Sequence, residues 1–326
     1  MYLTATFNHL RALQTWAATT GAKLTLDAAT LQLEVKYRNR YFEFFPLFIA
    51  KINGRIAHIP SLTAEATQFA GWRPYKPYLF ELSSDKLLFK QHMVAANQRT
   101  PNWWSSGAEA DVDFVMKRSM RSFGYELAGP FRTGSEFDPG PAEHGRGKMF
   151  AEQFVSGKIL KVWFWGGRPF FAHCQSHASV SGDGTSTLEA LLRRRIIENG
   201  GDWLSSEQAA VARSYCAYQQ LTRDQVPAFG TEVRYDYRYG RGSATSGTAA
   251  VSDNCLPSVS EAVKAQFDAA GDVIHVALRT QFAAPVVYAL DGILDGNDAV
   301  WWLEMNSNPV LPPEGYAKMF DDLFGY

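Results

Sequence analysis

The chain has 326 residues, of which 46% are hydrophobic, and it carries 32 basic side chains against 33 acidic ones. This length is two to three times that of a typical domain of about 100–150 residues, so we expect one large or several small domains with a sizeable core. The balance of charge excludes a protein that binds mainly to nucleic-acid phosphates, because such proteins carry an excess of Lys and Arg.

The first eighty residues are expected to form one unit. Apolar side chains from Phe7 to Trp16 recur with helical spacing, and the predicted helix ends at Gly21. An Asn-Gly turn at 53–54 is typical of a hairpin, and the Pro-rich segment 73–77 marks a boundary. The strands predicted in this unit are Lys23–Leu26, Leu31–Tyr37, Tyr41–Phe45, Leu47–Ile52 and Arg55–Ile59.

The middle of the chain begins with a helix that Ser83, Ser84 and Asp85 cap and that continues through Val94. Residues 133–148 are rich in Gly, Pro and charged residues, which predicts a loop. The strands predicted here are Asp111–Lys117, Met149–Val155, Ile159–Trp165 and Pro169–Ala178.

The last third predicts two helices with capping boxes, Ser186 with Glu189 and Ser205 with Gln208. The remaining predicted elements are a strand at Glu232–Tyr239, a helix at Val259–Ala270, and strands at Val286–Leu294 and Ala299–Asn306. This order of elements favours an α+β fold over a doubly wound sheet.

Features of targeting and redox state point to the cytoplasm. The longest apolar stretches, Tyr41–Ala50 and Pro285–Leu294, are shorter than the roughly 20 residues that span a bilayer. The first residues lack the basic region and apolar block of a secretory signal. Three distant cysteines fit a reducing compartment and small core positions better than a disulfide framework: Cys174, Cys216 and Cys255.

Asp291, Glu304 and Asn306 are the sharpest group of polar residues. Glu304 and Asn306 are two apart in a predicted strand and share a face, on which Trp302 is expected to continue the row. If the preceding strand pairs with this one, Asp291 joins them. Two carboxylates and an amide suit magnesium that is shared with nucleotide phosphates. An ordinary polar hairpin face with an Asn-Pro turn accounts for the same residues equally well.

Two lysines could bind phosphate. Lys86 lies in the first turn of a capped helix, and Lys117 ends an apolar strand before a loop that contains Ser122 and Gly124. A point charge beside backbone N–H groups is what phosphate binding needs. Each lysine taken alone is more typical of a solvated surface charge.

The strand and glycine turn of 150–157 could offer backbone groups to an adenine edge and an apolar wall to its face. The segments around Lys86 and Lys117, the segment 150–157, and the residues Asp291, Glu304 and Asn306 follow one another in this order along the chain. Taken together, they resemble the ATP-grasp superfamily of carboxylate–amine ligases over residues 80–310. Further segments resemble cyanophycin synthetase and related amino-acid and peptide ligases: Ser181–Leu191, Gln225–Gly230 and Ser243–Thr248.

The resemblance implies an ATP-grasp fold with two lobes that clamp ATP. It also implies that the chain is divided into a substrate unit at 1–80, a central lobe at 81–155 and a C-terminal lobe at 156–326. It implies that ATP phosphates bind Lys86 and Lys117 under a cover that includes Ser122 and Gly124. It further implies that adenine binds the hinge formed by Glu152, Gln153, Phe154 and Val155, and that Mg²⁺ binds Asp291, Glu304 and Asn306.

The chain departs from the family in two places, of which the milder is Val310, where many relatives have a glycine after the Asn-x-Asn-Pro segment. The family usually has an acidic residue for the ribose soon after the hinge turn, where this chain has Lys158 and Lys161. A cation near the reacting phosphate is also expected, and the candidates by position are Arg238, Arg241 and Arg279, with Arg241 preferred.

His173 and His177 are four residues apart in a segment that is predicted to be a strand. A zinc site with that spacing needs a helix, so a pocket or structural role is favoured.

The function that the resemblance implies is ATP-dependent amide or peptide bond formation through an acyl phosphate, with an amino acid or peptide as substrate. Positioning and charge neutralisation suffice for this chemistry, which agrees with a sequence in which no nucleophilic triad stands out. No nucleic acid or membrane is expected as a partner, and a homodimer is left open. The alternatives are a catalytically silent nucleotide-binding or peptide-binding module, or a kinase that acts without ligation.

Overall fold

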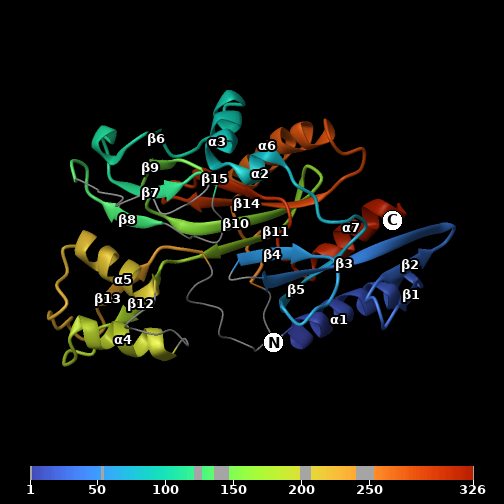
Figure 1. The fold of residues 1–326 in the computed structure, drawn as a ribbon, viewed down its shortest axis with the longest axis horizontal. Coiled ribbons are helices and arrows are strands. Elements are labelled where there is room, and N and C mark those ends of the chain that lie inside the picture. The colour runs from blue at the N-terminus through green and yellow to red at the C-terminus, as the bar shows by residue number, and fades with distance from the viewer. Residues whose placement is uncertain are drawn as a thin grey trace.

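The computed structural model describes residues 2–52, 55–120, 127–135, 147–198, 207–239 and 253–325. Its strands pair only in antiparallel fashion throughout these residues, and helices cover the sheets, so the α+β class is confirmed (Figure 1). No helix in the described part of the chain combines the length and apolar character that a bilayer crossing requires.

The N-terminal unit is a five-stranded sheet covered by one helix. The two strands predicted on either side of Pro46 form one long strand, β3. Pro46 lies beyond Phe44, the last residue whose partner is on β2, so its missing N–H interrupts no ladder on that side. The elements of this unit are α1 (Tyr2–Thr20), β1 (Lys23–Leu26), β2 (Leu33–Tyr37), β3 (Arg40–Ile52), β4 (Arg55–Ile59) and β5 (Ala66–Arg73).

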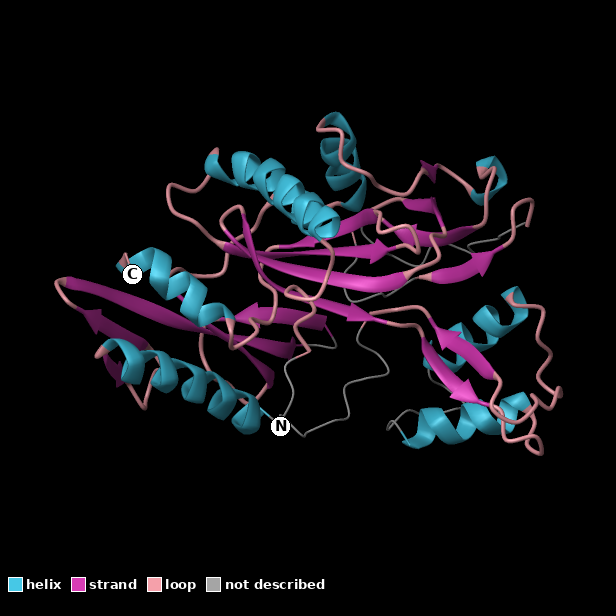
Figure 2. Ribbon diagram, turned by 180° about the vertical axis from the view of Figure 1, so that it is seen from behind, coloured by secondary structure: helices cyan, strands magenta, loops and turns pink. Residues whose placement is uncertain are grey.

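The last helix of the chain, α7 (Gly315–Phe324), packs onto this N-terminal unit (Figures 1 and 2). Phe320 lies with its ring centroid 4.6 Å from that of Trp16 on α1. The Tyr316 hydroxyl lies 2.8 Å from His9 Nδ1 and also accepts a 2.8 Å hydrogen bond from the Trp72 backbone N–H. Both ends of the chain therefore share one hydrophobic core.

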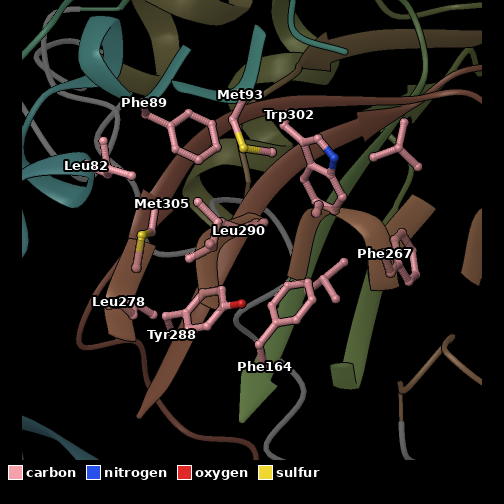
Figure 3. Packing of buried hydrophobic residues seen from close by; sticks show 14 of the residues in the cluster. Leu82, Phe89, Met93, Phe164, Phe267, Leu278, Tyr288, Leu290, Trp302 and Met305 are labelled. Carbon is pink, nitrogen blue, oxygen red and sulfur yellow. The ribbon is translucent and has the colours of Figure 1, made fainter. Parts of the chain in front are cut away.

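The central unit is the sheet β11-β10-β14-β15, with helices on one face. Figure 3 shows Phe89 and Met93 of α3 packed beside Trp302 and Met305 of β15, so the helix expected in the central lobe shares the core of this sheet. Helix α6 extends beyond the predicted end at 270, because Ile274 and Leu278 continue its buried face. The elements are α2 (Glu81–Ser84), α3 (Lys86–Ala95), β10 (Lys158–Trp165), β11 (Arg168–Gln175), α6 (Glu261–Arg279), β14 (Val287–Leu294) and β15 (Val300–Asn306).

The third unit joins the sheet β6-β9-β7-β8 to a helix pair and a two-stranded sheet. Val115 of β7 packs against Tyr215 of α5, which connects the two parts. The elements are β6 (Trp103–Trp104), η1 (Gly107–Glu109), β7 (Phe114–Arg118), β8 (Ala128–Phe131), β9 (Met149–Gln153), β12 (Ala178–Ser181), α4 (Leu188–Glu198), α5 (Glu207–Tyr218) and β13 (Glu232–Asp236).

Two local predictions are wrong. The strand predicted at 169–178 is divided into β11 and β12, which pair with different strands. The capping box is not formed, because the Ser186 hydroxyl donates to Asp183 at 2.6 Å and Glu189 pairs with Arg223 instead. The second predicted box, at 205–208, begins outside the described residues.

Candidate functional site

A cavity of about 1660 Å³ lies where the three units meet. Its walls come from β7 and β9 of the third unit, from β10, β14 and β15 of the central sheet, and from α1, β4 and the segment 307–317 at the N-terminal unit. This volume exceeds the roughly 300–1,000 Å³ of a typical small-molecule pocket, so more than one ligand can be accommodated.

The carboxylate group predicted from the sequence lines this cavity. Strands β14 and β15 pair so that Asp291 lies directly opposite Glu304. The Asn306 side chain donates a 3.0 Å hydrogen bond from Nδ2 to Asp291 Oδ2. The strand pairing on which the prediction depended is therefore confirmed, and the three side chains lie together.

Trp302 does not continue the row of Glu304 and Asn306, contrary to the sequence prediction. The register shifts between Asp291 and Gly292, whose partners are Glu304 and Trp302, so Leu303 is an additional residue in β15. Such a β-bulge reverses the alternation of side chains. Trp302 is consequently 1% exposed in the core, whereas Leu303 and Glu304 both line the cavity.

Lys86 reaches this carboxylate group from α3. Asp85 caps the helix by accepting a 2.8 Å hydrogen bond from the backbone N–H of Leu87, which fixes the first turn. The Lys86 ammonium lies 2.8 Å from Glu304 Oε2. The backbone N–H of Lys86 donates to the carbonyl of Ser119, so the start of α3 is held to the residue that follows β7.

Lys117 is the last residue but one of β7 and pairs with Glu152 of β9, which also binds Lys90 at 2.8 Å. Glu152 is 2% exposed and Lys90 is fully buried. Burial alone would raise the pKa of Glu152, but the ammonium groups of Lys117 and Lys90 outweigh it, and the pKa lies below its ordinary value. The Glu152 side chain is thus used to hold two lysines, and its backbone lies in β9 between β6 and β7, so that only the residues after it in the predicted hinge remain for an adenine.

The rest of the hinge segment borders an apolar slot. Gln153, the last residue of β9, and the following Phe154 and Val155 line the cavity. The Phe154 backbone N–H is already bonded to the Asp113 carbonyl at 2.8 Å. Val115 and Leu127 pack in one cluster with Phe154, and the paired residues Ile159 and Ile293, with Leu303, add apolar lining to the same cavity; we call this apolar lining the slot.

Sequence reasoning missed two lysines, Lys90 and Lys161. Lys161 lies opposite Asp291 in the β10–β14 pair, with its ammonium 2.7 Å from Asp291 Oδ1. It alternates with the core residues Leu160 and Val162, so it faces the cavity. The available signal was the single charge inside an otherwise apolar run of strand residues, and for Lys90 the single charge on the buried face of a helix.

The predicted arginines have different positions. Arg279 is exposed at the end of α6, where it bonds to the Ala283 carbonyl, and it does not line the cavity. Arg238 lines the cavity, but its guanidinium is held by Asp236 through contacts of 3.0 and 2.9 Å. Arg241, Ser122 and Gly124 lie outside the described residues.

His173 and His177 both line the cavity. His177 Nδ1 lies 2.7 Å from the Tyr215 hydroxyl, and burial, together with Arg234, lowers the pKa of this histidine to about 4. No group of three or more His, Cys, Asp or Glu side chains arranged for a metal ion occurs among the described residues.

The donor set of Asp291, Glu304 and Asn306 fits a magnesium ion. Mg²⁺ is commonly bound by one or two carboxylates and completes its shell with waters and substrate phosphates. Burial raises the pKa of Asp291, even though Lys161 opposes this effect. Burial would do the same to Glu304, but Lys86 outweighs it and the pKa is lowered. A cation at this place would satisfy both carboxylates when the lysines bind elsewhere.

No family model matches the chain, and no curated protein matches its sequence. Among solved structures it is similar to a bifunctional glutathione synthetase from Pasteurella multocida, with 15% identity and a TM-score of 0.44 over 97% of this chain and 43% of that one. It is also similar to the VanG D-Ala:D-Ser ligase from Enterococcus faecalis, with 9% identity and a TM-score of 0.41 over 75% of this chain and 61% of that one.

A third similar structure is the ADP complex of an N5-carboxyaminoimidazole ribonucleotide synthetase, with 10% identity and a TM-score of 0.38 over 70% of this chain and 46% of that one. The names are those of ligases and synthetases, the class that the sequence resemblance implies. The chain spans less than half the length of the glutathione synthetase. At TM-scores below 0.5 these likenesses carry no argument about the activity of this chain.

Proposed function

We propose that the protein is an ATP-dependent carboxylate–amine ligase that works through an acyl phosphate. The observation that carries the proposal is the alternation of lysines and carboxylates beside an apolar slot in one cavity. Lys86 and Lys161 hold Glu304 and Asp291, and Lys117 adjoins the hinge segment. A nucleoside triphosphate needs cations and an apolar wall together, because its phosphates require cations and its base requires an apolar surface.

In the proposed reaction, Lys86 and Lys117 bind the phosphates of ATP, while the backbone of 153–155 binds the adenine. Asp291, Glu304 and Asn306 would hold Mg²⁺, which when bound neutralises charge on the phosphates. A substrate carboxylate oxygen attacks the γ-phosphorus and ADP leaves. An amine then attacks the acyl carbon and phosphate leaves, so that a C–N bond forms.

Lys161 supplies a cation that Arg238, which is held by Asp236, and Arg279, which lies outside the cavity, do not. It is 13% exposed, faces the cavity and lies beside the proposed metal carboxylates. When a cation takes over Asp291, the Lys161 ammonium is released to neutralise the transferred phosphoryl group. A preorganised cation in a largely desolvated site stabilises developing charge strongly.

The part of the cavity that borders the N-terminal unit would bind the second substrate. Asn8, Thr15 and Thr19 lie on one face of α1 and line this part, together with His58 of β4 and Glu314 before α7. Arg11 of α1 and Glu314 add charges of opposite sign, and together these side chains favour a zwitterionic or polar ligand over an apolar one. We therefore propose an amino acid or a short peptide as substrate.

The test is release of ADP and phosphate from ATP and Mg²⁺ in the presence of the proteinogenic amino acids, singly and in pairs. The account predicts release that requires a carboxylate and an amine, and a loss of about 100-fold or more in Glu304→Gln. Glu261→Gln is the matched control, because Glu261 is 88% exposed and lies outside the cavity. Release of ADP without phosphate would favour a kinase, and nucleotide binding without turnover would favour a silent module.

A further inference from the structure

A cluster of polar side chains next to the proposed metal carboxylates has no role in the reaction as described so far. It consists of His173 on β11, Tyr239 after β13, and Asp253 before α6. All three line the cavity. His173 lies directly opposite Lys161 in the β10–β11 pair, so the cluster adjoins the place where the phosphoryl group would be transferred.

The three side chains form a chain of contacts. The Tyr239 hydroxyl lies 3.2 Å from His173 Nδ1, and His173 Nε2 lies 3.4 Å from Asp253 Oδ2. With the proton on Nε2, facing the carboxylate, Nδ1 keeps a lone pair that accepts from the Tyr239 hydroxyl. The partners of the two ring nitrogens thus favour this tautomer.

The ring of Tyr239 is fixed by its neighbours. The Lys161 ammonium lies 5.1 Å from the ring centroid, and the His173 ring is edge-on to it at 5.7 Å. Burial, with the carboxylates of Asp291 and Asp253, raises the pKa of Tyr239. The hydroxyl therefore stays protonated at neutral pH and is able to donate to His173.

We propose that Tyr239 and His173 remove the proton from the attacking amine during amide formation, with Asp253 orienting His173. As the amine nitrogen bonds to the acyl carbon and the bond to the phosphate oxygen breaks, an amine proton passes to the Tyr239 oxygen. The Tyr239 proton passes at the same time to His173 Nδ1, and the resulting imidazolium faces Asp253. This inference rests on the proposed ligase function.

The other groups that face this cluster are less suited to the task. Lys161 is an ammonium held 2.7 Å from Asp291 and has no lone pair to offer. Asp291 belongs to the proposed metal site. His173 is therefore the group in the described part of the cluster that offers a ring nitrogen to the hydroxyl and is backed by a carboxylate. A positioned base of this kind contributes about 10²–10⁴-fold to a rate.

Hydroxylamine separates this role from the rest of the reaction. It is largely unprotonated at pH 7 and attacks acyl phosphates without a base, which yields a hydroxamate. Amide and hydroxamate formation should be measured in wild type, Tyr239→Phe and His173→Gln, with ATP, Mg²⁺ and the amino acids that the ADP-release screen identifies. Tyr239→Phe keeps the ring over Lys161 and removes only the hydroxyl. His275→Gln is the control, because His275 does not line the cavity.

The expected result is a loss of amide formation of about 100-fold or more in both variants, with hydroxamate formation as in wild type and both reactions intact in the control. Equal loss of both products, or loss of neither, would overturn the inference and leave the ligase function standing. Absence of hydroxamate in wild type would overturn the ligase function, and the inference with it.

Discussion

Each carboxylate that we assign to magnesium holds a lysine ammonium in this structure, Glu304 with Lys86 and Asp291 with Lys161. A buried charge is costly unless it is paired, so these pairs stabilise the ligand-free protein. Under the proposed function, a metal–nucleotide complex would replace both pairs at once, because the cation would bind the carboxylates and the phosphates would bind the lysines. The arrangement predicts that nucleotide and metal bind together much more tightly than either does alone.

Lys161→Met tests this exchange. The substitution removes the ammonium that faces Asp291 and leaves an aliphatic chain of similar length. We expect turnover to fall by about 100-fold or more, because a preorganised cation is lost beside the reacting phosphate. The rate of ADP release at saturating ATP and Mg²⁺ measures the turnover of the variant and of wild type. A variant with wild-type turnover would show that Lys161 has only a structural role.

Glu152→Gln should destabilise the fold by about 3 kcal/mol, since it leaves the fully buried Lys90 without its carboxylate. Urea unfolding monitored by tryptophan fluorescence measures the change. Glu198→Gln is the control, because this glutamate is 54% exposed. Equal stability of the two variants would contradict the importance that we give to this buried pair.

The difference between wild type and Glu152→Gln should also depend on pH. The pKa of Glu152 is lowered in the folded state, so its contribution to stability is present above the unfolded pKa and is lost as pH falls through the folded pKa. The difference in the free energy of unfolding should therefore be constant near neutrality and shrink below pH 4.5, the ordinary value for glutamate. A difference that grows on acidification would have the wrong sign.

Among the elements, the hairpin of β14 and β15 decides the geometry of the site. Its pairing was predictable, because both strands are apolar runs joined by a short loop and their acidic residues fall at matching positions. The bulge at Leu303 was not predictable, because it depends on register and not on the type of residue. The position of Lys161 in the site was not predicted for a related reason. A single lysine in a strand sequence does not reveal which face of the strand is buried.

The glycine turn between β9 and β10 packs against the end of β14. A Cβ at Gly157 would lie 2.4 Å from the Leu294 carbonyl oxygen and 2.6 Å from Ile293 Cγ2. Gly157→Ala should therefore cost about 1–3 kcal/mol of stability through overpacking. A thermal melt measures this loss. Gly296→Ala, whose added Cβ would meet no atom within 4 Å, should leave the melting temperature unchanged, and equal melts for both variants would contradict the tight turn.

At the scale of the whole molecule, the cavity is assembled from units that the chain order does not reveal. The division expected at residues 80 and 155 follows the sequence, whereas the packing joins α7 to the N-terminal unit and α3 to the central sheet. Composition and periodicity predicted most of the individual elements. They could not predict these long-range contacts, because amphipathic helices such as α7 carry no signal for which sheet they cover.

Phe320→Ala tests whether the two ends of the chain form one core. Phe320 is fully buried, with ring centroids 4.6 Å from Trp16 and 4.9 Å from Phe44. The truncation should cost about 3–5 kcal/mol and loosen the N-terminal end of the cavity. Urea unfolding of the full chain measures the cost, and Lys318→Ala on the exposed side of α7 is the control. A loss below about 1 kcal/mol would indicate that α7 adds little to this core.

The central claim is that Mg²⁺ and ATP bind between the lysines and the carboxylates of this cavity. A crystal structure of the protein with Mg²⁺ and a non-hydrolysable ATP analogue tests it most directly. The account predicts the triphosphate between Lys117 and Glu304, the adenine against 153–155, and Lys161 turned from Asp291 toward the γ-phosphate. A nucleotide bound away from both Lys117 and Glu304 would contradict it.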